Sequence, residues 1–277
     1  MFMVGAGQMG TGIAQVALQS GYSVKMYDVA DAYLAKAKKR LEDGFQKSVD
    51  KNRMSAAEKE TCLARLSMTR ALEDAAAADL VIEAVVEDSA TKREIFAKLD
   101  ALCGANTIFA SNTSSISITE LASSTKRMDR FIGMHFFNPV PVMKLLEITR
   151  GIATTDETLK IAKEVGEKMG KVCVVSKDSP GFIVNRLLDP MLNEAIYLLD
   201  EGVASVEDID NGMVNGCNHP MGPLALTDLI GLDVVLAVME VLHREYGDSK
   251  YRPAPLLRKM VRAGYLGRKS GRGFYQY

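Results

Sequence analysis

The 277-residue sequence predicts an α/β fold, in which a domain built on a mainly parallel sheet is followed by an all-α C-terminal domain. Over the first two-thirds, short β-like runs alternate with helical stretches, a pattern typical of βαβ units. A glycine-rich turn follows the first apolar run. Beyond the turn signal DSPG at residues 178–181, the β-like alternation nearly vanishes. We therefore expect two domains, at residues 1–180 and 181–277.

The elements of the first domain are expected in βαβ order, with a further pair of strands at its end. The helix before the last strand has Thr155 or Asp156 as its cap. Beyond Pro180, apolar residues recur at helical spacing from Ile183 to Leu199. Strands are expected at 3–4, 23–27, 80–83, 107–111, 131–135, 145–149 and 172–175, and helices at 10–20, 30–49, 92–102, 156–169, 205–215 and 233–246.

Composition excludes several classes of partner. The 34 basic residues balance the 35 acidic ones, which gives no reason to expect nucleic acid or an anionic membrane as a partner. No apolar run approaches the roughly 20 residues of a membrane span, and the first residues do not form a signal peptide. The four cysteines form no CxxC pair and no Cys/His ligand set, so we expect no metal site and a reducing cytoplasm.

The sequence GAGQMG at residues 5–10 fits the G-x-G-x-x-G turn that binds the pyrophosphate of a dinucleotide. It follows an apolar run and opens a helix whose N-terminus carries partial positive charge. A purely structural glycine turn is the alternative. The first strand is short, because only four residues precede the turn. The context predicts a Rossmann-type domain with cofactor contacts from Gly5, Gly7, Gln8, Met9 and Gly10.

Asp28 ends the second β-like run, 18 residues beyond Gly10. A carboxylate at this place accepts hydrogen bonds from the adenosine ribose and repels a 2′-phosphate. The sequence therefore predicts NAD rather than NADP as the cofactor. The alternative is that Asp28 caps the following helix, and the two roles are compatible.

Three polar features point to chemistry at the carboxyl ends of the strands, where an open α/β sheet binds ligands. The sequence SNTSS at 111–115 follows a strand, and a plain turn and helix cap is an equally good interpretation. His135 ends another strand and has a candidate carboxylate partner in Glu147, as a general base for alcohol oxidation requires. Asn185 lies at the start of a helix beyond the boundary, where it could hold a carbonyl oxygen.

Taken together, these motifs resemble the 3-hydroxyacyl-CoA dehydrogenase family, and within it the short-chain bacterial enzymes that act on 3-hydroxybutyryl-CoA in butyrate-type metabolism. The likeness covers essentially the whole chain and rests on the order and spacing of the motifs. Besides the glycine turn, it is carried by SNTSS at 111–115, HFFNP at 135–139, PGFIVNR at 180–186, NHPMGPL at 218–224 and GRKSGRGFY at 267–275.

The resemblance implies a role for each matching position. His135 would be the general acid/base, and Glu147 would orient it. Ser114 and Asn185 would bind the substrate oxygens. On the cofactor side, Glu87 and Lys92 would contact the nicotinamide ribose, and Asn112 and Asn138 would line the nicotinamide. Lys47 and Lys51, four residues apart on one expected helix face, match positions near the CoA phosphates, although a solvated charged face explains them equally well.

The reaction implied is the NAD-dependent interconversion of (S)-3-hydroxybutyryl-CoA and acetoacetyl-CoA by a homodimer. The helical domain would complete the substrate cleft and form the dimer contact. Two alternatives stay open at this point. One is a dehydrogenase of the same fold for another hydroxy acid, such as 3-hydroxyadipyl-CoA or a sugar acid. The other is a non-catalytic, crystallin-like protein.

Overall fold

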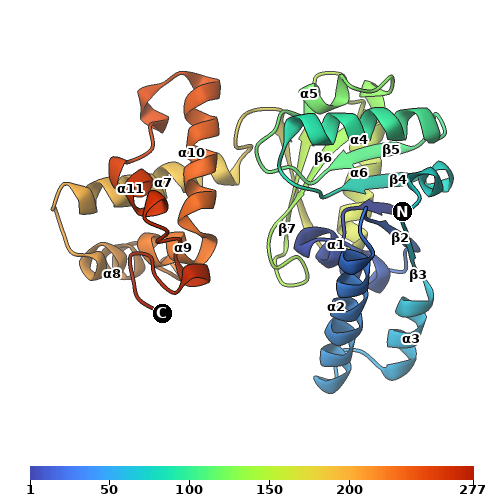
Figure 1. Cartoon of the computed structure of the whole chain (residues 1–277), viewed down its shortest axis with the longest axis horizontal. Helices are drawn as coiled ribbons and strands as arrows, with labels where there is room; N and C mark the ends of the chain where they lie inside the picture. The colour runs from blue at the N-terminus through green and yellow to red at the C-terminus, as the bar shows by residue number, and fades with distance from the viewer. The chain divides into compact units, whose positions relative to one another are not determined.

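The computed structural model describes residues 1–277, which form two compact units, Met1–Ser179 and Pro180–Tyr277 (Figure 1). The first unit contains an eight-stranded sheet in the order β3-β2-β1-β4-β5-β6-β7-β8. The strands from β3 to β6 are parallel, β7 runs antiparallel to β6, and β8 is parallel to β7. The strands are β1 (Phe2–Val4), β2 (Val24–Tyr27), β3 (Leu66–Thr69), β4 (Leu80–Glu83), β5 (Ile108–Ser111), β6 (Phe131–Phe136), β7 (Leu145–Arg150) and β8 (Val172–Lys177).

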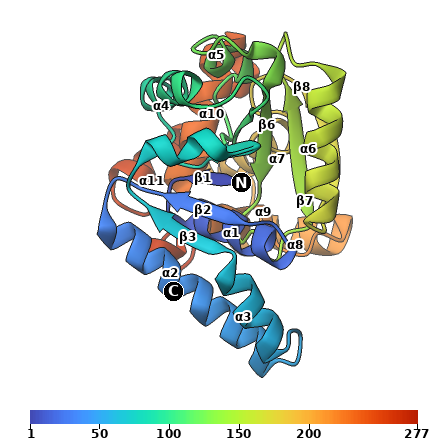
Figure 2. The same ribbon diagram turned by 90° about the vertical axis from the view of Figure 1, so that its right-hand side faces the viewer.

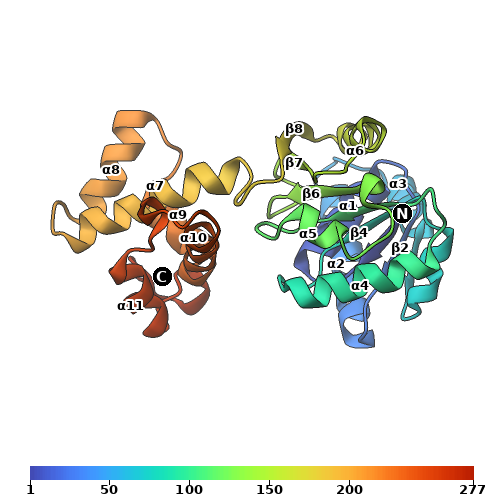
Figure 3. The same ribbon diagram turned by 90° about the horizontal axis from the view of Figure 1, so that it is seen from above.

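Helices cover both faces of this sheet, as its parallel strands require. On one face, α1 (Gln8–Gln19), α2 (Asp31–Asp50) and α6 (Asp156–Lys168) contribute to a shared apolar core. On the other face, Phe96 of α4 (Ser89–Leu102) packs against Phe109 and Phe131. Figure 3 shows α4 and α6 on opposite sides of the sheet. The short helix α5 (Ile118–Ala122) lies beside β6.

Three elements of this unit were not predicted: the short helix α5, a helix beside α2 and an edge strand. The helix α3 (Ala56–Ala64) pairs with α2 (Figure 2), and β3 forms the edge of the sheet beside β2. A capping box between Ser55 and Glu58 begins α3, and this is a readable sequence signal. The cap expected for α6 is Thr155, whose side chain accepts the amide hydrogen bond of Thr158. The predicted fold class, a Rossmann-type sheet followed by a helical part, is confirmed.

The second unit is helical, and all five of its α-helices contribute buried residues to its apolar core. Of its helices, α9 starts with Pro223, which suits a first helical turn, and α8 ends at Asn218 in the left-handed conformation. No helix of the chain is long and apolar enough to cross a bilayer. The helices are α7 (Val184–Asp200), α8 (Val206–Cys217), α9 (Pro223–Ile230), α10 (Leu232–Tyr246) and α11 (Pro255–Arg262); short 3₁₀ turns occur at Leu72–Ala77, Met128–Arg130, Ser249–Tyr251 and Arg268–Ser270.

Candidate active site

The candidate site lies along the carboxyl edge of the sheet. Because β1, β2, β4, β5 and β6 are parallel, their C-terminal ends meet at this edge, and the order of the strands reverses between β1 and β4. Open α/β sheets bind their ligands at such a switch point. Most of the residues predicted for the site follow one of these five strands.

The glycine turn joins β1 to α1 with backbone geometry that side chains would prevent. Gly5 has a φ of +104°, and a Cβ at Gly10 would lie 1.9 Å from the Gly5 carbonyl oxygen. At Gly7, by contrast, a Cβ would meet nothing within 4 Å, so the surface of the turn is open there. No side chain caps the N-terminus of α1. Open space beside uncapped helix amides fits the pyrophosphate of a dinucleotide.

Asp28, at the end of β2, is tied to this turn. One carboxylate oxygen accepts the Ala6 amide at 2.9 Å, and the other accepts the Ala30 amide at 3.3 Å, one residue before α2. Each oxygen has a further lone pair for a ribose hydroxyl. The alternative that Asp28 caps the following helix is wrong, because the N-cap of α2 is Ala30 and Asp28 accepts the amide of that residue, not one of the first helical turn. Through its hydrogen bond with the Ala6 amide, Asp28 also stabilises the glycine turn.

His135 and Glu147 form a buried pair. They lie directly opposite each other in the antiparallel ladder between β6 and β7, so their side chains share one face of the sheet. The His135 Nδ1 lies 2.7 Å from a Glu147 carboxylate oxygen. Glu147 is fully buried and His135 is 6% exposed. The Phe137 ring packs on the imidazole, with 4.5 Å between ring centroids. The pair therefore has a fixed ring orientation, with Nδ1 directed at the carboxylate.

The loop after β5 is organised around Glu87. Its Oε1 accepts the Thr113 hydroxyl at 2.6 Å and the Ser114 amide at 2.8 Å, and the hydroxyls of Ser114 and Ser115 at 3.2 Å each. Burial alone would raise the pKa of the Glu87 carboxyl. The Lys92 ammonium and the hydrogen bonds from Thr113 and Ser114 outweigh burial and hold that pKa below its ordinary value.

The two asparagines predicted for the nicotinamide side connect neighbouring loops. The Asn112 side-chain oxygen accepts the Phe136 amide at 2.9 Å, which joins the ends of β5 and β6. The Asn138 side-chain oxygen accepts the Gln8 amide group at 2.9 Å, which links the loop after His135 to the glycine turn. Lys92 is 1% exposed, and its ammonium lies between two carboxylates, so it reaches the site through Glu87.

Three predicted residues lie away from this edge or in the other unit. Lys47 is in the last turn of α2 and Lys51 follows the helix as its C-cap, so the helix face on which both were expected ends at Asp50. Both lysines are exposed and neither forms an ion pair. Asn185 is the second residue of α7 in the second unit, and Ser114 belongs to the first.

Two further residues that the sequence did not single out hold the loops of the site. Lys171, before β8, is buried and donates to the carbonyl oxygens of Val140 and Met143, and so fixes the loop that follows His135. Burial lowers the pKa of its ammonium. Asp178 accepts the amides of Ile118 and Thr119 at the start of α5. Neither stood out, because a lone Lys or Asp in a turn gives no periodic signal.

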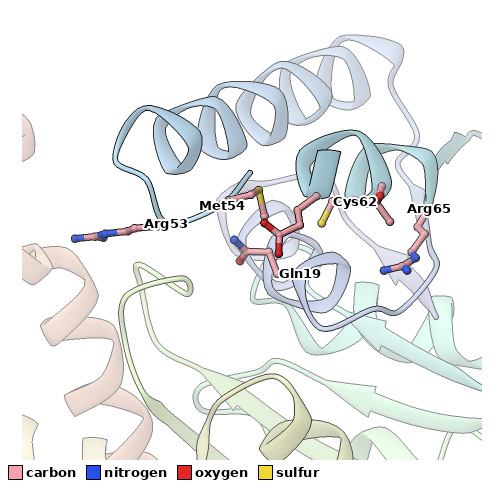
Figure 4. A pocket seen from close by; sticks show the side chains of 7 residues that line it. Gln19, Arg53, Met54, Cys62 and Arg65 are labelled. Atoms are coloured by element: carbon pink, nitrogen blue, oxygen red, sulfur yellow. The ribbon is translucent and has the colours of Figure 1, made fainter. Parts of the chain in front are cut away.

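A separate pocket of about 390 Å³ opens between the end of α1, α3 and the loop before α3 (Figure 4). Gln19 lines it and is the last residue of the 12-residue α1, which places the pocket about 18 Å along the helix from the glycine turn. In Figure 4 the Arg53 side chain points away from the pocket. The pocket is therefore not part of the site at the strand edge.

Comparison with known protein families identifies the family of both units. The profile of the 3-hydroxyacyl-CoA dehydrogenase NAD-binding domain matches residues 1–179, and that of the family's C-terminal domain matches residues 181–277. The chain belongs to the 3-hydroxyacyl-CoA dehydrogenase family. The predicted family, the enzyme class of NAD-dependent 3-hydroxyacyl-CoA dehydrogenase and the cofactor NAD are thereby confirmed.

Relatives of this dehydrogenase match over nearly the full chain. A 3-hydroxybutyryl-CoA dehydrogenase of Bradyrhizobium diazoefficiens is 52% identical over 275 residues, covering 99% of this chain and 94% of the relative. The human mitochondrial hydroxyacyl-coenzyme A dehydrogenase is 44% identical over 283 residues, covering 99% and 90%. The crystal structure of (S)-3-hydroxybutyryl-CoA dehydrogenase from Ralstonia eutropha superposes with a TM-score of 0.97 at 52% identity, covering 100% and 98%.

Proposed function

We propose that this dehydrogenase interconverts (S)-3-hydroxybutyryl-CoA and acetoacetyl-CoA, with His135 and Glu147 as its acid–base pair. The observation that carries the proposal is the 2.7 Å contact between the His135 Nδ1 and the fully buried Glu147 carboxylate. In a ring oriented at Nδ1 by a carboxylate, the other nitrogen, Nε2, is the atom that exchanges a proton with substrate.

In the oxidative direction, Nε2 of His135 would take the proton of the C3 hydroxyl, and the resulting imidazolium would be stabilised by Glu147. In the reductive direction, the same imidazolium would return the proton to the C3 oxygen. NAD, when bound, supplies the chemistry of hydride exchange at C3. The products of oxidation are the 3-ketoacyl-CoA, NADH and one proton, so protons and electrons balance.

The chain's own residues would orient the cofactor. The uncapped N-terminus of α1, with open space at Gly7, suits a pyrophosphate, and Asp28 suits the adenosine ribose. Glu87, with its lowered pKa, is a charged acceptor for the nicotinamide ribose hydroxyls. Asn112 and Asn138, whose side chains each join two loops of the site, would lie beside the nicotinamide.

Ser114 and Asn185 are proposed to bind the substrate oxygens. Ser114 lies in the loop after β5, and its hydroxyl contacts Glu87 at 3.2 Å, longer than the usual 2.7–2.8 Å of such bonds. Asn185 lies in the first turn of α7, where its carboxamide can donate to a carbonyl oxygen.

The proposal that the substrate is a CoA thioester with a short acyl chain is supported by other observations. Relatives at 52% identity are named for 3-hydroxybutyryl-CoA. The exposed ammonium groups of Lys47 and Lys51 suit the CoA phosphates. A longer or dicarboxylic acyl chain, such as 3-hydroxyadipyl-CoA, is the competing substrate.

We also propose that the second unit forms a homodimer contact, because it exposes large apolar side chains on several helices. Leu187 of α7 is 72% exposed and Leu229 of α9 is 48% exposed. Sedimentation analysis tests this proposal: the parent protein should sediment as a dimer, and Leu187→Asp should shift it toward monomer. A parent protein that is monomeric at micromolar concentration would contradict it.

The decisive experiment compares 3-ketoacyl-CoAs from C4 to C16 with NADH and NADPH. We expect the highest kcat/KM with acetoacetyl-CoA and NADH. His135→Gln should lower kcat at least ~10²-fold, as loss of a general acid/base does. His243→Gln on α10 is the matched control and should keep the parent rate. Near-parent turnover by His135→Gln, or equal rates with NADPH, would overturn the mechanism or the cofactor preference respectively.

A further inference from the structure

Glu83 is a buried carboxylate to which neither the sequence motifs nor the proposed mechanism gives a role. It ends β4 and is fully buried. Three groups donate to it: the Lys92 ammonium at 2.6 Å, the Ser111 hydroxyl at 2.6 Å and the Val85 amide at 2.7 Å. A buried carboxylate satisfied by three donors is costly to assemble and has a defined orientation.

Lys92 joins this carboxylate to Glu87. Its ammonium lies 2.6 Å from Glu83 Oε1 and 3.2 Å from Glu87 Oε2, so one cation serves two carboxylates and is held closer to the buried one. Glu87 Oε1 is crowded by donors from Thr113, Ser114 and Ser115. Only Oε2 of Glu87, at the longer distance from Lys92, retains capacity for another donor.

Glu83 also holds both loops that Glu87 bridges. The Val85 amide begins the segment that leads to Glu87. The Ser111 hydroxyl donates to Glu83 and accepts the Thr113 amide at 3.2 Å, which sets the start of the loop after β5. Buried Glu83 therefore holds in place both the segment after β4, which carries Glu87, and the loop after β5, which donates to Glu87.

We propose that Glu83 is a positioning residue for the cofactor: it draws the Lys92 ammonium inward and leaves Glu87 Oε2 able to accept a nicotinamide ribose hydroxyl. This inference rests on the proposed contact between Glu87 and the cofactor. Without the charge of Glu83, Lys92 moves toward Glu87 and competes with the ribose for the same oxygen. Glu83 does not touch the cofactor itself, because it is fully buried.

The test measures the binding of NADH to the Glu83→Gln variant by fluorescence titration, in the absence of acyl substrate. The amide keeps the shape and removes the charge, and we expect NADH to bind about tenfold more weakly, the loss typical of one hydrogen bond to a charged group. The matched control is Asp100→Asn, which breaks a largely buried ion pair of the same unit, with Arg127 at 2.6 Å. It should lower Tm and leave the Kd for NADH unchanged.

A double-mutant cycle with Glu87→Gln separates positioning from general destabilisation. If Glu83 acts through Glu87, Glu83→Gln should add little once Glu87 is replaced. Additive losses, or a Glu83→Gln variant that loses Tm but keeps the parent Kd, would overturn the inference. Parent-like NADH binding by Glu87→Gln alone would instead overturn the proposed cofactor contact.

If Glu83→Gln does not fold, Ser111→Ala carries the test. It removes one donor to Glu83 and leaves all three charges in place. We expect a two- to threefold weaker affinity for NADH, in line with the loss of one uncharged-donor hydrogen bond. An unchanged Kd in a folded Ser111→Ala variant would count against the role of Glu83.

Discussion

Replacing Glu147 by Gln isolates the contribution of its charge to the proposed acid–base pair of His135 and Glu147. The amide oxygen can still accept from the His135 Nδ1, so the ring orientation set by the 2.7 Å contact is retained. Because Glu147 is fully buried, no solvent group takes over the lost charge. The substitution therefore tests whether stabilisation of the imidazolium by a carboxylate contributes to the rate.

The structure sets the expected size of this effect. A hydrogen bond to a charged group contributes about 1.5–3 kcal/mol and a neutral one about 0.5–1.5 kcal/mol, so the exchange costs at least about 1 kcal/mol. The Coulomb attraction of an ion pair at ~4 Å and an effective dielectric constant of ~20 sets an upper bound of about 4 kcal/mol. At 1.36 kcal/mol per decade, kcat should fall about 5- to 900-fold.

The assay is acetoacetyl-CoA reduction, with NADH oxidation followed by absorbance. Thr149→Val is the matched control: Thr149 is on the same face of β7, two residues along, fully buried and hydrogen-bonded to Ser176 at 2.9 Å. It should lose about 1 kcal/mol of stability and keep its kcat. The reasoning is refuted if Glu147→Gln turns over within twofold of the parent, or if Thr149→Val loses as much activity.

Four other substitutions test single features. Burial raises the pKa of Asp189 to about 7, so its stabilising contribution is present below pH 4 and is lost as pH rises through 7; Asp189→Asn should therefore have a higher Tm than the parent at pH 8 and equal it at pH 4. Gly10→Ala places a Cβ against the Gly5 carbonyl and should lower both Tm and NADH affinity, whereas Gly7→Ala should lower NADH affinity alone, since nothing of the protein lies within 4 Å of its Cβ. Arg127→Met strands Asp100 and several carbonyl oxygens and should cost about 3–5 kcal/mol in urea unfolding; a loss below 1 kcal/mol would contradict this.

Sequence patterns predicted those parts of the site whose residues lie close together in the sequence. The glycine turn and Asp28 depend on a strand, a tight turn and a helix, and all three leave marks within thirty residues of sequence. The pairing of His135 with Glu147 was predicted from chemistry. The antiparallel ladder that places them opposite each other was not, because strand direction depends on how β7 enters the sheet.

The rest of the network depended on contacts between distant strands. Glu83 ends the otherwise apolar run LVIE, and a charge at that place is a signal of a buried partner that could have been recognised. Its partners on α4 and β5 lie 9 and 28 residues away, and no periodicity marks either contact. The edge strand β3, with sequence LSMT, has weak alternation and is only partly buried, so it resembled a loop.

The antiparallel contact of β6 with β7 has a consequence for redesign of this enzyme. The contact between His135 and Glu147 depends on the register of one ladder, in which the two residues are opposite each other, and not on the path of the connection between the strands. A slip of one residue would turn one partner to the opposite face, whereas the connecting loop can change length as long as the ladder holds. That loop, held by Lys171, is therefore where the sequence can be changed without breaking the contact between His135 and Glu147.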